Sequence, residues 1–256
     1  MNRVAVVVGG SEGIGRATVL HMAEKGYRVV VSSRSEHKLE AVKEELAARG
    51  LQAITAAGDI TDAAFRLRLF EQIDNKYGRL DILVNSVPGA DPASFLQHDI
   101  QDVEAGIRMK LIPYLDNMKL ASARMRTNGW GRIVNVVGNM WKEPESLRYN
   151  FGIVNAAIVN ASKAVSFELA PLGITVNGVH PGSIRSERLD SVFRATAEKL
   201  QLTKEQVEQK AASAIPAGRI GEPEEAAALI GFLVSEEASF VTGQQISVDG
   251  GAMRSM

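Results

Sequence analysis

The chain has 256 residues, no cysteine, and 29 basic against 30 acidic side chains, which gives a formal net charge of −1. With 45% hydrophobic and 23% charged residues, its composition is that of a globular protein of one large or two small domains. The lack of cysteine excludes disulfides, thiolate nucleophiles and cysteine-based zinc sites. The balanced charge provides no basic block for a phosphate backbone, so no nucleic-acid partner is expected.

The predicted elements alternate between strand and helix along the whole chain. Val4 to Val8 is a nearly uninterrupted β-branched run, which is typical of a strand buried on both faces, and a helix is expected from about Gly13 to near Gly26. Further strands are expected at 29–31, 53–56, 82–84, 132–137, 174–179 and 245–248. Helices are expected at 39–46, 65–73, 103–125, 155–169 and 224–233, and a polar helical excursion at 187–212.

This order predicts an α/β fold: a single-domain, Rossmann-type, doubly wound parallel sheet of about seven strands with helices on both faces. The domain is expected to span residues 1–256. Within it, the charged segment 185–214 is interpreted as a substrate lid, with a solvated surface helix as the alternative. No apolar stretch approaches the roughly 20 residues of a bilayer span, and the start of the chain lacks leader features, so no membrane partner and a cytoplasmic location are expected.

The first strand ends in a glycine-rich turn, Gly9-Gly10-Ser11-Glu12-Gly13-Ile14-Gly15, that opens into the first helix. Glycines let the backbone turn tightly and approach a pyrophosphate, and free N–H groups at a helix start attract an anion. An ordinary tight turn would have the same composition. The position after the first strand of an alternating chain favours a dinucleotide site.

The segment about 20 residues further on indicates which nicotinamide cofactor binds. An acidic residue there would bond the ribose 2′-OH of NAD(H) and repel a 2′-phosphate. The chain has Ser32-Ser33-Arg34 instead, two hydroxyls and a guanidinium that suit a phosphate, so NADP(H) is expected to be preferred over NAD(H). Glu12 in the glycine turn argues against this preference, and a solvated loop charge is the alternative for Arg34.

On these and further segments the sequence resembles the short-chain dehydrogenases/reductases over its full length. The glycine turn matches the family's TGxxxGIG, with Val8 in place of threonine, while Gly58-Asp59-Ile60 resembles the adenine-contacting motif and Leu83-Val84-Asn85-Ser86 stands where LVNN is expected. The resemblance implies a homotetramer or homodimer, with the 240–256 tail at one interface, and a small-molecule carbonyl or alcohol as substrate. The implied cofactor-binding residues are Gly9, Ser11, Glu12, Gly13, Ile14, Gly15, Ser33, Arg34, Asp59, Ile60, Asn85 and Ile184.

The resemblance breaks down at the catalytic positions. The family reacts through a tetrad of Asn, Ser, Tyr and Lys, and each position is located here from its neighbouring motifs. The tyrosine and lysine positions fall on Phe151 and Asn155, the serine position on Gly138, and the asparagine position on Lys110. All four residues of the tetrad are therefore replaced.

Two interpretations follow from this replacement. One is a redox-silent nucleotide-binding member of the family with a structural, regulatory or non-redox role. The other is an oxidoreductase with a rearranged site, because lysine and asparagine have exchanged places, at positions 110 and 155, that face each other in the family. Lys110 would then act as an electrostatic stabiliser, or as an acid whose pKa is lowered by burial. We rank the rearranged enzyme first.

Three residues are candidates for the missing proton donor. Tyr149, two residues before Phe151, is preferred because a displacement by two residues in a loop is easily absorbed. His180 has an ordinary pKa near 6.5 that suits proton exchange, and Tyr114 lies one turn beyond Lys110. The structural alternative is a cover for the pocket mouth for Tyr149, a packed ring for His180 and a core residue for Tyr114. The candidate catalytic set is Lys110, Tyr149, Asn155 and His180.

An apolar pocket is expected to be lined by Met140, Trp141, Val192 and Phe193. The histidines are scattered along the chain, so no metal site is predicted.

Overall fold

The computed structural model describes residues 3–89, 95–96 and 99–255. Its strands form one parallel, seven-stranded sheet in the order β3-β2-β1-β4-β5-β6-β7, which confirms the predicted doubly wound fold. The strands are β1 (Val4–Val8), β2 (Arg28–Ser33), β3 (Ala53–Ala57), β4 (Ile82–Asn85), β5 (Gly131–Val136), β6 (Ile174–Pro181) and β7 (Gln245–Val248). The α-helices are α1 (Gly13–Glu24), α2 (Glu36–Ala48), α3 (Ala63–Tyr77), α4 (Ile100–Gly106), α5 (Ile112–Asn128), α6 (Tyr149–Leu169), α7 (Glu187–Leu200), α8 (Lys204–Ser213) and α9 (Pro223–Leu233).

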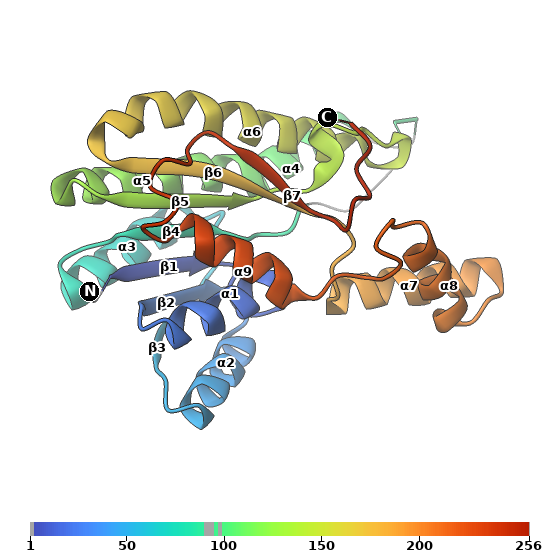
Figure 1. The fold of residues 1–256 in the computed structure, drawn as a ribbon, viewed down its shortest axis with the longest axis horizontal. Helices are drawn as coiled ribbons and strands as arrows, with labels where there is room; N and C mark the ends of the chain where they lie inside the picture. Colours follow the sequence, from blue (N-terminus) through green and yellow to red (C-terminus); the bar gives the residue numbers. More distant parts are fainter. Residues whose placement is uncertain (1–2, 90–94, 97–98, 256) are drawn as a thin grey trace.

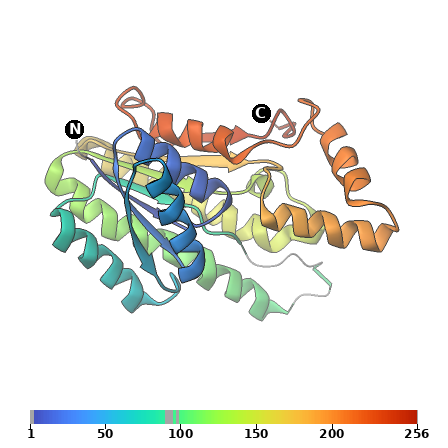
Figure 2. The same cartoon turned by 90° about the horizontal axis from the view of Figure 1, so that it is seen from below.

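Helices cover both faces of the sheet (Figures 1 and 2). Val4, Val6 and Val8 of β1 pack in a core with side chains of α3 and α5, whereas Ala5 and Val7 pack in a second core with α1, α2 and α9. Because alternate residues of a strand point to opposite faces, both sets must be apolar. This explains why the central strands read as continuous apolar runs.

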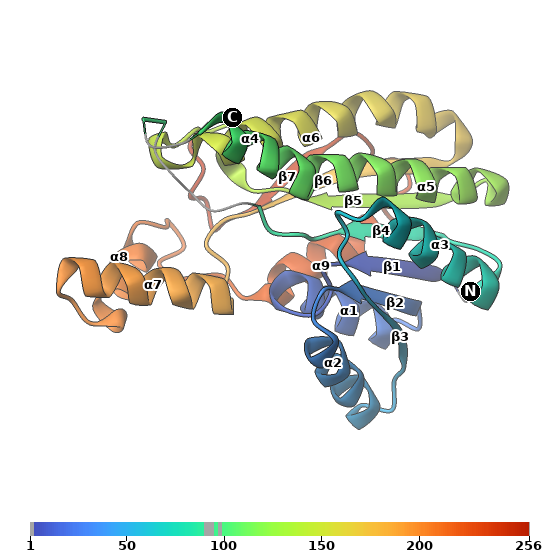
Figure 3. The same cartoon turned by 180° about the vertical axis from the view of Figure 1, so that it is seen from behind.

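All strands of a parallel sheet end at the same edge, and the α7–α8 pair lies beyond that edge, apart from the layered body (Figures 1 and 3). The strand order reverses between β1 and β4, which pair directly from Ala5 with Ile82 to Val8 with Asn85. A reversal of this kind leaves a crevice outside the carboxyl ends of the two strands, where ligands of such sheets bind. The glycine turn that follows β1 opens into this crevice.

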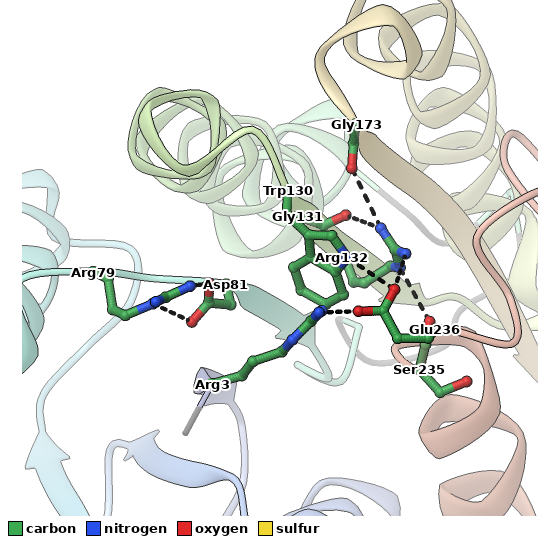
Figure 4. A network of polar contacts seen from close by, with 9 residues as sticks. All are labelled: Arg3, Arg79, Asp81, Trp130, Gly131, Arg132, Gly173, Ser235 and Glu236. Atoms are coloured by element: carbon green, nitrogen blue, oxygen red, sulfur yellow. Dashed lines mark hydrogen bonds and ion pairs between the residues drawn. The ribbon is translucent and has the colours of Figure 1, made fainter. Parts of the chain in front are cut away.

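A polar network links the strands at the edge of the sheet where they begin, opposite the crevice (Figure 4). The guanidinium groups of Arg3 and Arg132 lie 3.2 and 4.1 Å from the centre of the Trp130 ring, and Glu236 bonds both Arg3 and the Trp130 indole nitrogen. Nearby, the fully buried Asp81 accepts the backbone N–H of Val4 at 2.8 Å and is paired with Arg79. These contacts join the starts of β1, β4 and β5 far from the crevice.

The helix expected at 103–125 is not continuous. A π-helical turn, η1 (Ile107–Leu111), separates α4 from α5, and the Ile112 N–H bonds the Ile107 carbonyl five residues earlier. Pro113, at the start of α5, has no N–H to donate to Met109, so an ordinary helical ladder is interrupted there. Lys110 lies within this turn, and π-helical turns occur frequently at functional sites.

A second difference concerns α6, which begins at Tyr149 rather than near Asn155. Tyr149 and Phe151 are therefore helical residues, not loop residues. The expected excursion at 187–212 is two helices, α7 and α8, joined around Gln201, which adopts a left-handed conformation with φ 54°. None of the helices in the described ranges combines the length and hydropathy needed to span a membrane.

Candidate active site

The glycine turn forms a backbone cradle at the carboxyl end of β1. Gly9 has φ +81°, and an added Cβ would lie 2.4 Å from the Ser86 carbonyl oxygen, while a Cβ on Gly15 would lie 2.1 Å from the Gly9 oxygen. Only glycine fits these two positions. Glu12, the N-cap of α1, makes no side-chain capping bond, so first-turn N–H groups are open to an anion. Ser11 and Ile14 are half-buried in this turn.

The segment from the end of β2 to the start of α2 carries the residues expected to bind the 2′ position of the cofactor ribose. Arg34 is exposed and makes no ion pair with any residue in the described ranges, and Ser33 Oγ contacts only the Ser35 carbonyl, at 3.4 Å. Across from it, the backbone N–H of Thr61 donates to Asp59 and lowers the pKa of that carboxyl, with a smaller contribution from the Arg34 charge. Asp59 is therefore ionised, and its carboxylate is held by the Thr61 backbone.

Asn85 lies at the predicted crevice, but its side chain is used inside the protein. It is fully buried, donates to Asn135 Oδ1 at 2.9 Å and accepts from Asn117 Nδ2 at 2.9 Å. Asn135 in turn donates to Ser162 Oγ at 2.9 Å, so the chain of hydrogen bonds links α5, β4, β5 and α6. A contact of Asn85 with the cofactor would have to come from its backbone. Ile60 and Ile184 are also buried, the latter in a bridge to Gly221.

Lys110 is the unusual charged residue of this region. Its side chain is only 6% exposed, and no group in the described part of the chain accepts a hydrogen bond or an ion pair from it. Its ammonium nitrogen lies 5.4 Å from the centre of the Tyr114 ring. Burial, together with a smaller contribution from the charge of Arg188, lowers the pKa of Lys110 from 10.5 to about 8. At neutral pH this group is therefore a cation that can also release its proton.

Asn155 lies on α6, which packs against the π-helical turn through Val154 and Ile158. It is 2% exposed and donates to the Gly138 carbonyl at 3.2 Å. A Cβ on Gly138 would lie 3.2 Å from the Asn155 amide nitrogen. Gly138 and Asn155, the residues expected at the family's serine and lysine positions, are thus in contact with each other.

His180 ends β6 beside the same space. Its Nδ1 lies 2.7 Å from the Val137 carbonyl oxygen and its Nε2 lies 2.8 Å from the Gln245 side-chain oxygen. The ring is fully buried, 5.2 Å from the Trp141 ring, and burial lowers its pKa. Both nitrogens are occupied within the protein, as expected for the packed-ring alternative.

The two tyrosines differ in environment. Tyr114 is fully buried, with its hydroxyl accepting from the Val87 N–H at 3.0 Å and donating to the Val136 carbonyl at 3.1 Å, and burial raises its pKa. It is a core residue. Tyr149 is half-buried and its ring meets the Phe95 ring edge-on at 5.4 Å. Tyr149 and Phe151 lie on the same helix, where a separation of two residues corresponds to a rotation of about 200°. The Tyr149 side chain therefore points away from that of Phe151, and the expectation that a loop absorbs the displacement is wrong.

Sequence reasoning missed Arg188, on the first turn of α7. Its guanidinium donates to the Gly89 carbonyl at 3.4 Å and lies 5.7 Å from the centre of the Phe151 ring. No local pattern in the sequence indicates these contacts, because they join segments far apart in the chain.

The expectation that Phe193 lines a substrate pocket is corrected by the structure. That ring is buried among Ala197, Val207 and Ile215, where it holds α7 on α8.

Comparisons with known proteins agree with this fold. Residues 8–253 match the family model described as enoyl-(acyl carrier protein) reductase. The chain is 43% identical over 256 residues to the NADPH-dependent reductase BacG of Bacillus subtilis (strain 168), covering 99% of each. It is 33% identical over 252 residues to the monensin polyketide synthase putative ketoacyl reductase of Streptomyces virginiae, covering 98% of this chain and 97% of the relative.

Among solved structures, that of YwfH, an NADPH-dependent reductase involved in bacilysin biosynthesis, superposes with a TM-score of 0.95 at 42% identity over the full length of both chains. The sequence relatives and this structure extend over the sheet, the glycine turn and the α7–α8 segment alike. This chain belongs to the short-chain dehydrogenase/reductase family.

Proposed function

We propose that this protein is an NADP(H)-dependent oxidoreductase that interconverts a carbonyl and an alcohol with a rearranged active site. The observation that carries the proposal is Lys110: a buried lysine with a pKa of about 8, held in a π-helical turn. Its ammonium lies 5.4 Å from the ring of Tyr114, whose hydroxyl bonds Val87 just beyond the carboxyl end of β4. Perturbed ionisable groups of this kind gather at functional sites. The likeness to relatives named as NADPH-dependent reductases supports the same conclusion.

The residues around the crevice fit an NADP(H) molecule. The cradle of Gly9 and Gly15 lets a pyrophosphate approach the backbone, the uncapped start of α1 offers N–H donors, and Arg34 has an open guanidinium for a 2′-phosphate. The bound nicotinamide would supply or accept the hydride. Positioning of the substrate and transfer of the proton then fall to the side chains of this chain.

Lys110 would act on the oxygen of the substrate. Its ammonium is preorganised in a buried position, so it stabilises the negative charge that develops on a carbonyl oxygen during reduction. With a pKa of about 8 it can also donate a proton to that oxygen and recover one from solvent. Asn155, held by the Gly138 carbonyl, keeps the facing side of the site polar but uncharged.

The sequence leaves the proton donor open between Lys110 itself and the side chains of Tyr149, His180 and Tyr114. Lys110 ranks first, because it is buried and its proton is not committed to any acceptor in the described part of the chain. Tyr149, half-buried at the start of α6, remains the alternative hydroxyl. His180 ranks below both, because its two nitrogens already contact Val137 and Gln245. Tyr114 is a core residue with its hydroxyl already bonded.

The segment 185–214 is proposed as the substrate lid, because α7 begins beside the crevice and its Arg188 contacts Gly89 and Phe151. A homotetramer or homodimer remains the proposed assembly, in a cytoplasmic location. In its support, Phe167 of α6 is 68% exposed, and Phe240 at the start of the tail is fully exposed. The last residue of that tail, Met256, lies outside the described residues.

Hydride transfer under single-turnover conditions tests the proposal. The protein is mixed with NADPH deuterated at the transferring position of C4, together with a panel of ketones, oxo acids and enones, and deuterium in the products is measured by mass spectrometry. The proposal predicts labelled product from at least one class, and loss of the label with Lys110→Met. Tight cofactor binding with no labelled product from any class, or full turnover by Lys110→Met, would favour the redox-silent alternative.

A further inference from the structure

Three elements around the crevice are joined by one lysine. The ammonium of Lys38, in the first turn of α2, bonds the Glu12 carboxylate of the glycine turn and lies 2.8 Å from Glu187 Oε2 at the start of α7. The two carboxylates raise the pKa of Lys38. The cluster of Glu12, Lys38 and Glu187 is therefore a charged contact between the cofactor turn, α2 and the proposed lid.

The position of this cluster coincides with the place where a 2′-phosphate is expected. Ser35 caps α2 by accepting the Lys38 backbone N–H at 3.3 Å, so Lys38 lies in the first helical turn after Ser33 and Arg34. On the other side, a Cβ added to Gly13 would lie 3.7 Å from the Ser186 Cβ, which puts the start of α7 against the glycine turn. The ammonium thus lies where the turn and the β2–α2 loop meet.

The charges of the cluster do not suit a phosphate as they stand. Two carboxylates surround one ammonium, and their net negative charge would repel a dianion. Glu12 is fixed in the glycine turn, whereas the Glu187 side chain is 78% exposed and reaches Lys38 only because α7 is in place. Exposed ion pairs of this kind contribute little free energy, so a phosphate competes effectively for the lysine. Glu187 is the partner that is exchanged most easily.

We propose that Lys38 is a specificity-determining residue for NADP(H): with Arg34 it binds the 2′-phosphate, and the phosphate replaces Glu187 as its partner. Glu12 then has a role that agrees with an NADP(H) preference, because it holds Lys38 at the glycine turn. NAD(H) has no 2′-phosphate and leaves the contact with Glu187 intact. The inference rests on the proposed NADP(H) preference and adds that NADP(H) alone loosens the start of α7.

Cofactor affinities of Lys38→Met test the assignment. Lys43→Met is the matched control, because Lys43 lies on the same helix and bonds Glu40 of that helix, at 2.8 and 3.0 Å. Dissociation constants for NADPH and NADH are measured by fluorescence titration. Lys38→Met is expected to weaken NADPH about five- to tenfold and NADH less than twofold, Lys43→Met to change neither, and Glu187→Gln to tighten NADPH about two- to fivefold.

Hydrogen exchange gives a readout that is independent of affinity and turnover. Amides at the start of α7 are expected to exchange faster with saturating NADPH than with saturating NADH, and this difference should disappear in Lys38→Met. An unchanged ratio of NADPH to NADH affinity in Lys38→Met would overturn the assignment while leaving the NADP(H) preference in place. Equal affinities in the unmodified protein would overturn both. Lys38-dependent binding without turnover would contradict only the proposed reaction.

Discussion

Replacing Lys110 by methionine should make the protein more stable while removing its activity. The folded state lowers the pKa of Lys110 from 10.5 to about 8, and a tenfold change in proton affinity corresponds to 1.36 kcal/mol. Keeping this ammonium charged in the folded protein at pH 7 thus costs about 3 kcal/mol. Methionine fills a similar space without a charge, so we expect the free energy of unfolding to rise by about 1–3 kcal/mol, or the Tm by about 2–10 °C.

The pH dependence of the stability gained by Lys110→Met is a sharper test than the magnitude of that gain at one pH. Below pH 8 Lys110 is charged in both states and the cost is complete. Between pH 8 and 10.5 the folded state loses its proton before the unfolded state does, so the stability of the unmodified protein rises relative to the variant. Urea unfolding at pH 7 and pH 9 should show the gain falling by about 1 kcal/mol. Lys119→Met, an exposed change on α5, is the control. A destabilised Lys110→Met at pH 7 would show that the buried ammonium does not carry this cost.

Three further changes test other parts of the account. Arg34→Asp should reverse the order of NADPH and NADH affinities, measured by titration, because a carboxylate repels the 2′-phosphate and accepts a ribose hydroxyl. Phe151→Tyr with Asn155→Lys should reduce model ketones more slowly than the same variant that also carries Lys110→Asn, since two facing ammonium groups disfavour each other's charge. Asp81→Ala should lower the free energy of unfolding by about 2–4 kcal/mol in urea titrations, because it leaves a buried backbone N–H and an arginine without their acceptor.

The alternation of strands and helices could be predicted because each depends on local periodicity. Val4 to Val8 indicates a strand buried on both faces wherever it occurs, and the glycine turn is defined by its own backbone geometry. The π-helical turn was missed because apolar spacing continues through it. Pro113 was the available signal, since a proline inside a helical pattern interrupts the hydrogen bonds of the preceding turn.

Side-chain roles that depend on distant partners could not be predicted. Asn85 matches a cofactor motif in sequence, but its amide is taken up by Asn135 and Asn117, 50 and 32 residues away. His180 is occupied in the same way by Val137 and Gln245. The burial of Lys110, on which the proposed chemistry depends, likewise arises from packing between elements that only the folded chain brings together.

The proposed role of Lys110 as proton donor is tested most directly by the pH dependence of single-turnover NADPH oxidation. The unmodified protein is compared with Lys110→Ala, with a carbonyl substrate found in the labelling panel. If Lys110 donates the proton, the rate of reduction falls as pH rises through about 8, and the reverse oxidation rises over the same range. Lys110→Ala should lose about a hundred- to a thousandfold in rate and lose this titration, with NADPH affinity nearly unchanged. A Lys110→Ala variant that keeps both the rate and the titration near pH 8 would contradict the claim.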